Sequence, residues 1–187
     1  MKIGFLGGAF DPPHIGHYKI IEYCINIFDK LLIIPNKISP MHNKEIIASE
    51  YHRMNMLNLL FKNDDIKIDN FELSSNKKNY TYYTIKYLEN KYKGDSLTMI
   101  LGEDQLNNLD HWYNYEYIVD NMEILCFSRI VPNQITTKLI NKIEFVDLNF
   151  DVSSSNIREL FKNDVSIDND LINENIRQYI IKESLYK

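Results

Sequence analysis

Short apolar runs alternate with helix-like segments along this chain, and this alternation constrains the fold more than any other feature of the sequence. Strands are expected at the apolar runs 2–6, 31–34, 97–101, 124–127 and 143–148, and at 66–73, where apolar and polar residues alternate. Helices are expected at 15–28, where apolar residues recur every three or four positions, and at 83–92, 153–162 and 171–183. Strands separated by helices of this length usually pair in parallel through right-handed crossovers. The sequence therefore predicts an α/β, Rossmann-like, doubly wound sheet that is mainly parallel and carries helices on both faces.

One more helix is expected after Ser49, whose side chain is placed to cap it. The residues expected on its apolar face are Met54, Leu57, Leu60 and Phe61. Similarly, Ser153 or Ser154 is expected to cap the helix at 153–162.

The bulk composition indicates one domain, spanning residues 1–187. A chain of 187 residues with 44% hydrophobic content can bury one substantial core, and it shows no linker, repeat or low-complexity tract. Its formal net charge of -5 argues against the broad basic surface that non-specific nucleic-acid binding requires. No apolar stretch approaches the roughly 18 residues of a membrane helix. The two cysteines, Cys24 and Cys126, lie in apolar segments, which favours buried reduced thiols and a cytoplasmic protein.

The residues after the first expected strand are typical of a phosphate-binding turn. Gly7 and Gly8 would let phosphate oxygens approach the backbone N–H groups, and the helix that follows would direct its free N–H groups to the same place. His14 and His17 lie three residues apart, so both imidazoles can donate hydrogen bonds to one anion. The alternatives are that one histidine caps the helix or pairs with Asp11, or that the pair binds zinc, for which no third ligand stands nearby. Asp11 itself is expected to brace the turn.

Two segments resemble the signatures of the HxGH nucleotidyltransferase superfamily. Residues 8–17, GAFDPPHIGH, are similar to its GxFDPxHxGH signature, and residues 152–158, VSSSNIR, resemble its ISxTxIR signature. Five further segments resemble the nicotinate-nucleotide adenylyltransferase branch of that superfamily, namely residues 40–42, 53–57, 80–81, 100–106 and 112–113. The chain departs from this pattern at Asn43, where a basic residue is usual, at Asn79 in place of serine, and at Val152 in place of isoleucine.

The resemblance implies an ATP site and an adjoining nucleotide site. It implies that the ATP phosphates are held by His14, His17, Ser153, Ser155 and Arg158, with His14, His17 and Arg158 as the catalytic residues. The ATP-binding residues expected in the preceding turn are Gly7, Gly8, Ala9 and Phe10. It implies that Gly102 and Asp104 meet the adenosine ribose. The residues implied for the nicotinate nucleotide are His42, Lys44, Tyr80, Thr81, Tyr82, Trp112, Tyr113 and Arg129.

Several of these residues have alternative interpretations. Trp112 is implied to stack on the pyridine ring, although a lone tryptophan is as readily a packing residue. Lys44 needs a local shift to reach a phosphate, and Arg129 could be a surface arginine. Backbone N–H groups near Tyr82 and Tyr113 are implied to grasp the nicotinate carboxylate, which would disfavour the amide.

The implied reaction transfers the adenylyl group of ATP to nicotinate mononucleotide, giving nicotinate adenine dinucleotide and pyrophosphate in NAD biosynthesis. Mg²⁺ is expected to accompany ATP, held by phosphates and water, with no metal site made by the protein. The rival hypotheses are the same chemistry on nicotinamide mononucleotide or phosphopantetheine, and a nucleotide-binding protein without turnover. The expected partners are these small molecules, with no nucleic acid and no membrane, and a homo-oligomer stays an open alternative.

One argument does not depend on the resemblance. Parallel sheets bind ligands beyond the carboxyl ends of their strands. The candidate residues that follow expected strands are Gly7, His42, Tyr80, Gly102, Arg129 and Ser153. These scattered segments are therefore expected to converge at one edge of the sheet.

Overall fold

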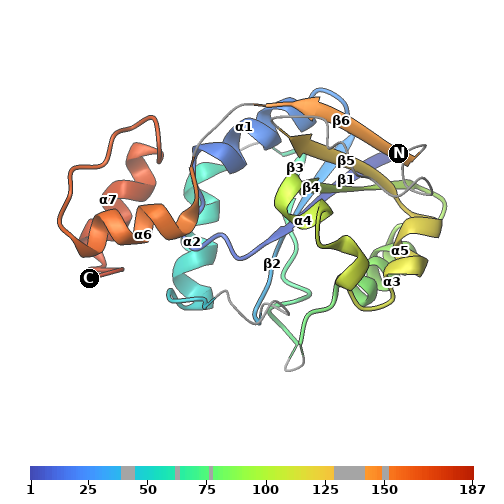
Figure 1. Cartoon of the computed structure of the whole chain (residues 1–187), viewed down its shortest axis with the longest axis horizontal. Helices are drawn as coiled ribbons and strands as arrows, with labels where there is room; N and C mark the ends of the chain where they lie inside the picture. The colour runs from blue at the N-terminus through green and yellow to red at the C-terminus, as the bar shows by residue number, and fades with distance from the viewer. Residues whose placement is uncertain (39–44, 62–63, 76–77, 129–141, 149–151) are drawn as a thin grey trace.

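A computed structural model of the chain shows a six-stranded, wholly parallel sheet in the order β3-β2-β1-β4-β5-β6 (Figure 1). The structure describes residues 1–38, 45–61, 64–75, 78–128, 142–148 and 152–187. The strands are β1 Lys2–Gly8, β2 Lys30–Pro35, β3 Ile66–Ile68, β4 Ser96–Gly102, β5 Glu123–Ser128 and β6 Ile143–Asp147. This order is that of a doubly wound Rossmann-like sheet, which confirms the predicted fold class.

Helices cover both faces of the sheet, as predicted. They are α1 Ile15–Cys24, α2 Glu50–Leu60, α3 Thr81–Lys91, α4 Glu103–Leu106, α5 Tyr115–Asn121, α6 Ser154–Lys162 and α7 Glu174–Lys182, with a short 3₁₀ helix at Leu109–His111. Alternate residues of the strands point to opposite faces. Ile3 and Phe5 of β1 therefore pack with Ile85 of α3 and Ile118 of α5 on one face, whereas Leu6 packs with α1 on the other.

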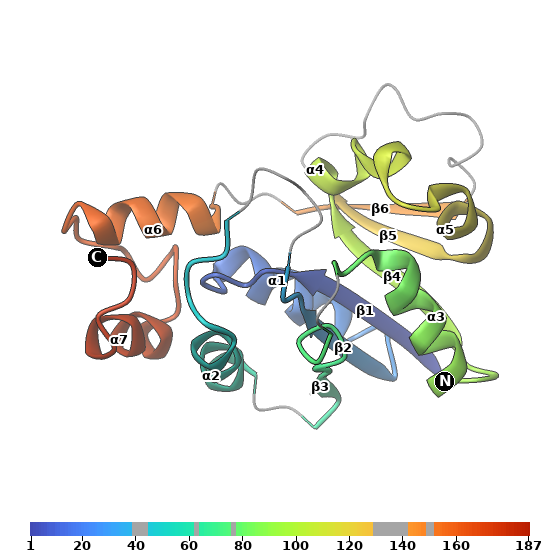
Figure 2. The ribbon, with the colours of Figure 1, turned by 90° about the horizontal axis from the view of Figure 1, so that it is seen from below.

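A third apolar cluster lies beside the sheet and joins α2, α6 and α7. It contains Met56 of α2, Ile157 of α6 and Ile176 of α7, together with Tyr186. In both views these three helices lie together at one side of the molecule, away from α3 and α5 (Figures 1 and 2). The cluster brings the segment after β6 next to the helix that follows β2.

Three expected elements differ from the structure. The strand expected at 66–73 ends at Ile68, because the Asp69 carboxylate accepts a hydrogen bond from the Phe71 N–H and starts a turn. The helix expected at 15–28 ends at Cys24 and continues as a turn.

The third difference concerns the face that α2 buries. The buried positions are Arg53, Met56 and Leu57, so only Leu57 of the four expected residues is fully buried. Helices α4 and α5 were not predicted.

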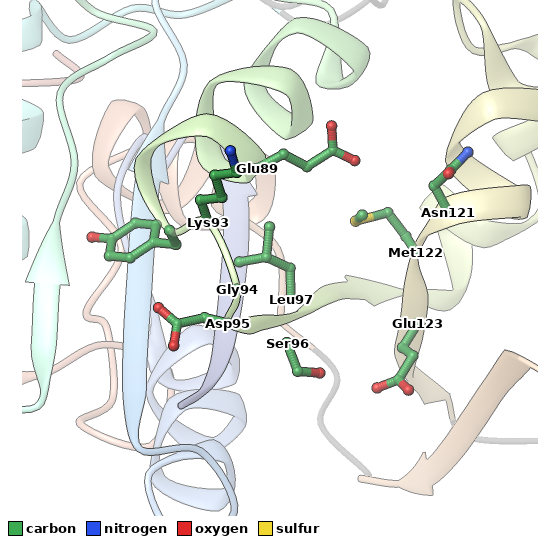
Figure 3. Close-up of a pocket in the computed structure, with 10 residues that line it drawn as sticks. Glu89, Lys93, Gly94, Asp95, Ser96, Leu97, Asn121, Met122 and Glu123 are labelled. Atoms are coloured by element: carbon green, nitrogen blue, oxygen red, sulfur yellow. The ribbon is translucent and has the colours of Figure 1, made fainter.

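The order of the strands makes the two edges of the sheet different. The chain leaves β1 and β4, its two central strands, toward opposite sides, and ligands in such sheets bind beyond the carboxyl ends at this point. At the opposite, amino-terminal edge is a shallow cavity of about 380 Å³. Its lining includes Glu89, Lys93, Asp95 and Glu123 (Figure 3).

No helix in the described ranges is long and apolar enough to cross a membrane.

Candidate active site

The turn after β1 is held by a buried arginine of α2. Arg53 is 1% exposed, and its Nη1 donates to the carbonyl oxygen of Ala9 at 2.7 Å. In a trans peptide the N–H lies opposite the carbonyl. The Phe10 N–H therefore faces away from Arg53. Burial lowers the pKa of Arg53, opposed by the nearby Asp11 carboxylate. With its very high intrinsic pKa, the guanidinium stays a charged donor under the turn.

The conformation of this turn explains its second glycine. Phe10 has a φ of 49° and is buried, with its ring directly under Gly8. A Cβ atom at Gly8 would lie 3.2 Å from that ring, closer than ordinary packing allows. Gly8 therefore lets the backbone lie close to the Phe10 ring, where a side chain would not fit.

The two histidines are in contact at the start of α1. His14 is the N-cap residue, its backbone N–H donates to Nδ1 of His17 at 3.2 Å, and the two ring centroids are 3.8 Å apart. Because Nδ1 of His17 accepts this bond, a neutral His17 carries its proton on Nε2 and presents an N–H donor on the far side of its ring. His14 is buried, and desolvation lowers its pKa to about 4, so it is neutral near pH 7.

The N-terminus of α1 offers fewer free donors than the sequence suggested. The N–H of His14 is bonded to His17, and the N–H of Ile15 donates to the carbonyl of Leu171 at 3.1 Å. The prediction that this helix directs its first free N–H groups at phosphate is therefore wrong for these two groups, because the His17 ring caps the first and the connection between α6 and α7 caps the second. The imidazoles and the preceding turn are the remaining candidate donors.

Asp11 braces the turn, as expected, and it does so by connecting distant segments. Its carboxylate is 1% exposed and accepts hydrogen bonds from the N–H groups of Ile47 at 2.7 Å and Ala48 at 3.1 Å. The hydroxyl of Tyr186 donates to the same carboxylate at 2.7 Å. A buried carboxylate requires such donors, because an unpaired charge in the interior is very costly.

Helix α6 is fastened to the same turn. Ser153 caps the helix by accepting from the Asn156 N–H, which confirms one of the two caps expected there. Ser154 donates through Oγ to the carbonyl of Pro12 at 2.9 Å. Arg158 donates to the Asp11 carbonyl at 2.6 Å and to Ser155 Oγ at 3.2 Å, and its Nη1 lies 3.8 Å from the Asp11 carboxylate. A residue 147 positions away thus joins the two-histidine turn.

A group of tyrosines lies at the start of α3 and before α5. The ring of Tyr113 is 5.0 Å from that of Tyr80, 5.8 Å from that of Tyr82 and 5.7 Å from that of Tyr83. The structure therefore brings together three residues implied for the nicotinate nucleotide, Tyr80, Tyr82 and Tyr113. Thr81 is the first residue of α3 and lies between two of them in sequence.

Trp112 is half-buried and packs against the core cluster of the sheet. This contact is the packing role named as the alternative for it, and it leaves part of the side chain exposed.

Asn79 links these tyrosines to the turn after β1. Its Oδ1 accepts from the N–H groups of Lys37 and Ile38, both at 3.1 Å, and its Nδ2 donates to the Glu72 carbonyl. The neighbouring Asn36 donates its N–H to the carbonyl of Gly8 at 2.9 Å. A chain of hydrogen bonds therefore runs from the end of β1, through the end of β2, to the start of α3.

The end of β4 supplies the remaining candidates. Gly102 is the N-cap of α4, and a Cβ atom placed there would meet nothing within 4 Å. Asp104 lies in the first turn of α4 and is exposed. Beside them, Glu103 accepts a hydrogen bond from Ser128 Oγ at 2.8 Å, which joins the carboxyl ends of β4 and β5. These residues line the same edge of the sheet as the two histidines.

Some candidates fall outside this geometry. His42, Lys44 and Arg129 lie outside the residues that the structure describes. Among the described residues, no group of three or more His, Cys, Asp or Glu side chains could hold a metal ion. Cys24 and Cys126 are buried and free, and burial raises the pKa of both thiols to about 12, so they are unreactive near neutral pH.

Sequence reasoning assigned no role to three residues that shape the site: Arg53, Asn79 and Tyr186. Arg53 stands among apolar residues of a helix, and a buried arginine there could have been suspected from that pattern alone. The contacts of Asn79 and Tyr186 join segments 42 and 175 residues apart, and no local pattern announces them.

The chain is similar along its whole length to a group of related enzymes. The cytidylyltransferase-like family matches residues 5–160. The chain is 30% identical over 190 residues to the nicotinate-nucleotide adenylyltransferase of Bacillus subtilis, covering 100% of this chain and 98% of that protein. It is 31% identical over 193 residues to a protein of Flavobacterium psychrophilum named a probable nicotinate-nucleotide adenylyltransferase, with 100% of both chains covered.

The fold also has solved counterparts. The structure of Plasmodium falciparum nicotinic acid mononucleotide adenylyltransferase complexed with NaAD superposes with a TM-score of 0.81. The alignment covers 99% of this chain and 97% of that one, at 21% identity. At that identity the likeness supports the fold.

Proposed function

The chain belongs to the nicotinate-nucleotide adenylyltransferase family, and we propose that it joins the adenylyl group of ATP to nicotinate mononucleotide, acting as one domain over residues 1–187. The observation that carries the proposal is the junction of two distant segments at one turn. His14 and His17 stand at the start of α1. Arg158 of α6 donates to the carbonyl of Asp11, which lies in the turn that joins β1 to α1. Donors so arranged suit a polyphosphate, in addition to the contacts by which they hold the turn and α6 together.

The phosphates of ATP are proposed to lie over this turn. The backbone of Gly7, Gly8, Ala9 and Phe10 forms its floor, and His14 and His17 donate from the start of α1. Ser153, Ser155 and Arg158 approach from α6. The Nε2–H of His17 and the remaining N–H groups of Arg158 are the donors to the negative charge that builds up during transfer.

The adenosine and the acceptor are proposed to lie on either side of the phosphates. Gly102, with open space where a Cβ would be, and Asp104 would meet the ribose of ATP. The tyrosine group at Tyr80, Tyr82 and Tyr113, with Thr81 and the exposed part of Trp112, would hold the pyridine nucleotide. Roles for His42, Lys44 and Arg129 in binding that nucleotide remain predictions from the sequence.

The reaction needs alignment more than it needs a nucleophile of the protein. An oxygen of the 5′-phosphate of nicotinate mononucleotide attacks the α-phosphorus of ATP and forms a new P–O bond. The bond from that phosphorus to the oxygen bridging the α- and β-phosphates breaks, and its electron pair leaves with pyrophosphate. The attacking phosphate is already ionised, so no general base is required, and catalysis rests on positioning and charge neutralisation.

Mg²⁺ is proposed to enter with ATP. The buried Asp11 carboxylate is occupied by Ile47, Ala48 and Tyr186, so it is not a ligand for the ion. The donor set at the turn is made of N–H groups, which bind anions. An ion of this kind keeps several waters and binds through substrate phosphates, where it neutralises charge on them.

The test compares acceptors. Purified protein with ATP and Mg²⁺ is given nicotinate mononucleotide, nicotinamide mononucleotide or phosphopantetheine, and pyrophosphate release yields kcat/KM for each. We expect the acid to exceed the amide by roughly 10- to 100-fold, because two backbone donors pair with a carboxylate but leave the NH₂ of an amide unsatisfied. Equal or reversed values would contradict the proposed acceptor, and no turnover with any of the three would contradict enzymatic activity.

A further inference from the structure

Tyr186 reaches the active site from beyond α7. Its side chain is 7% exposed and packs in the cluster formed by α2, α6 and α7, against the ring of Phe161 at 6.3 Å. Its backbone has a φ of 64°, a conformation uncommon for a residue with a bulky side chain. The phenol of Tyr186 nevertheless makes one well-defined contact, a hydrogen bond of 2.7 Å to Oδ1 of Asp11.

This hydrogen bond completes the set of donors around the Asp11 carboxylate. Oδ1 accepts from the Ala48 N–H and from Tyr186, and Oδ2 accepts from the Ile47 N–H, with Nη1 of Arg158 3.8 Å away. The phenol is a neutral donor whose proton is secure, because burial and the adjacent carboxylate both raise the pKa of Tyr186. Hydrogen bonds to ionised groups are among the stronger ones in proteins.

The position of Asp11 in turn determines that of Arg158. The same guanidinium nitrogen that lies 3.8 Å from the carboxylate donates to the Asp11 carbonyl at 2.6 Å. Without the phenol, one lone pair of Oδ1 loses its donor in a buried site, and the carboxylate can turn toward Arg158, whose Nη1 already lies 3.8 Å from Oδ2. Such a turn would tighten the ion pair and draw the guanidinium away from the phosphates.

We propose that Tyr186 is a positioning residue for adenylyl transfer: its hydroxyl holds the Asp11 carboxylate on the 47–48 backbone, and thereby keeps Arg158 directed at the ATP phosphates. This inference rests on the proposed function of the site. The phenol touches neither substrate, so its effect falls on the alignment of the reacting groups and leaves the pocket of the pyridine nucleotide unchanged.

The experiment compares Tyr186→Phe with Tyr179→Phe. Tyr179 lies on α7 in the same cluster, and its hydroxyl bonds to His52 at 2.8 Å and Asn55 at 2.9 Å, both on α2, with no contact to Asp11. Both variants remove the hydroxyl of one tyrosine of the cluster formed by α2, α6 and α7, but only Tyr186→Phe removes a donor to Asp11. We expect Tyr186→Phe to lower kcat by about 10- to 100-fold, since a small misplacement at the reacting centre costs that much, with the KM of nicotinate mononucleotide changed less than about twofold. Tyr179→Phe should keep kcat within about twofold of the wild type.

A double-mutant cycle separates positioning from a general loss of folding. In an Asp11→Asn background the Tyr186→Phe change should lower kcat by less than about twofold, because the group through which it acts is already altered. The melting temperature of each variant is measured by circular dichroism, and kinetics are recorded well below it.

The outcomes are distinct. Near-normal kcat in Tyr186→Phe, an equal loss in Tyr179→Phe, or full additivity with Asp11→Asn would each overturn the positioning role while leaving the proposed function intact. If the wild type releases no pyrophosphate with nicotinate mononucleotide, the proposed function fails and this inference fails with it.

Discussion

The hydrogen bond between the His14 backbone and the His17 ring allows the two tasks of His17 to be tested separately. Nδ1 accepts from His14, so a neutral His17 carries its proton on Nε2, and Nε2–H is the donor proposed for phosphate. Replacing His17 by alanine removes both groups. Loss of a donor to developing charge costs about 2.7–4 kcal/mol, equivalent to a roughly 10²- to 10³-fold lower kcat. Loss of the acceptor at the helix start costs about 1 kcal/mol of folding stability.

Substituting His17 by asparagine or by glutamine separates the effect on kcat from the effect on folding stability. The Oδ1 atom of asparagine falls near Nδ1 of histidine, so His17→Asn should keep the contact to His14 and the stability but lose the donor to phosphate. Glutamine places its amide near Nε2, so His17→Gln should recover part of the lost kcat at reduced stability. His52→Ala, which removes a histidine bonded to Tyr179 outside the site, should leave kcat unchanged.

The assay for this series is steady-state pyrophosphate release with saturating ATP and nicotinate mononucleotide, with the free energy of unfolding from urea denaturation measured in parallel. The expected order of kcat is wild type, then His17→Gln, with His17→Asn and His17→Ala lowest. If His17→Asn turned over at near the wild-type rate, the role of Nε2–H as a donor in the transition state would be refuted.

Three further predictions concern other parts of the site. Arg158→Ala should raise the KM of ATP and lower kcat, because a bidentate donor is lost; unchanged ATP kinetics would remove this residue from the site. Asn79→Ala should raise the KM of nicotinate mononucleotide several-fold with a smaller effect on that of ATP, since two backbone N–H groups at the end of β2 lose their acceptor; an equal change in both constants would argue against a local effect. Burial raises the pKa of Glu72 to about 7 from 4.5, so its neutral form favours the folded state, and this contribution, at most about 3 kcal/mol, is full below pH 4.5 and is lost as the pH rises through 7. Glu72→Gln should therefore flatten the pH dependence of the melting temperature between pH 4.5 and 7, and an unchanged slope would show that another group is responsible.

The sheet was largely predictable because its strands are nearly continuous apolar runs, as buried parallel strands should be. The exception is the strand expected at 66–73, where alternation continued past Ile68. The turn there depends on Asp69, which is buried and also accepts a hydrogen bond from Lys91 of α3 at 2.8 Å. That contact comes from another element, so local alternation could not reveal it. Similarly, the buried face of α2 is set by the Ala9 carbonyl that Arg53 must reach.

The candidate site was predictable only where its chemistry is concentrated in sequence. Two histidines around a glycine, next to a glycine pair, predict a phosphate-binding turn by themselves, and the likeness to a known signature added Arg158 to that prediction. What holds these groups in place was not visible. Asp11 could be assigned to bracing, but its partners Ile47, Ala48 and Tyr186 belong to segments that meet only in the folded chain.

The separation of the two edges of the sheet also affects how substrates arrive. Helices α1, α3 and α6 direct the positive ends of their dipoles at the edge that carries the histidines, whereas three carboxylates and one ammonium group line the cavity at the other edge, from Glu89, Asp95, Glu123 and Lys93. The molecule as a whole carries a formal charge of -5, so at long range it repels anionic nucleotides. Attraction dominates only within about one Debye length, roughly 8 Å at physiological ionic strength. Capture of ATP therefore depends on diffusion to the correct edge followed by short-range contact, and added salt weakens the distant repulsion as well as the local attraction.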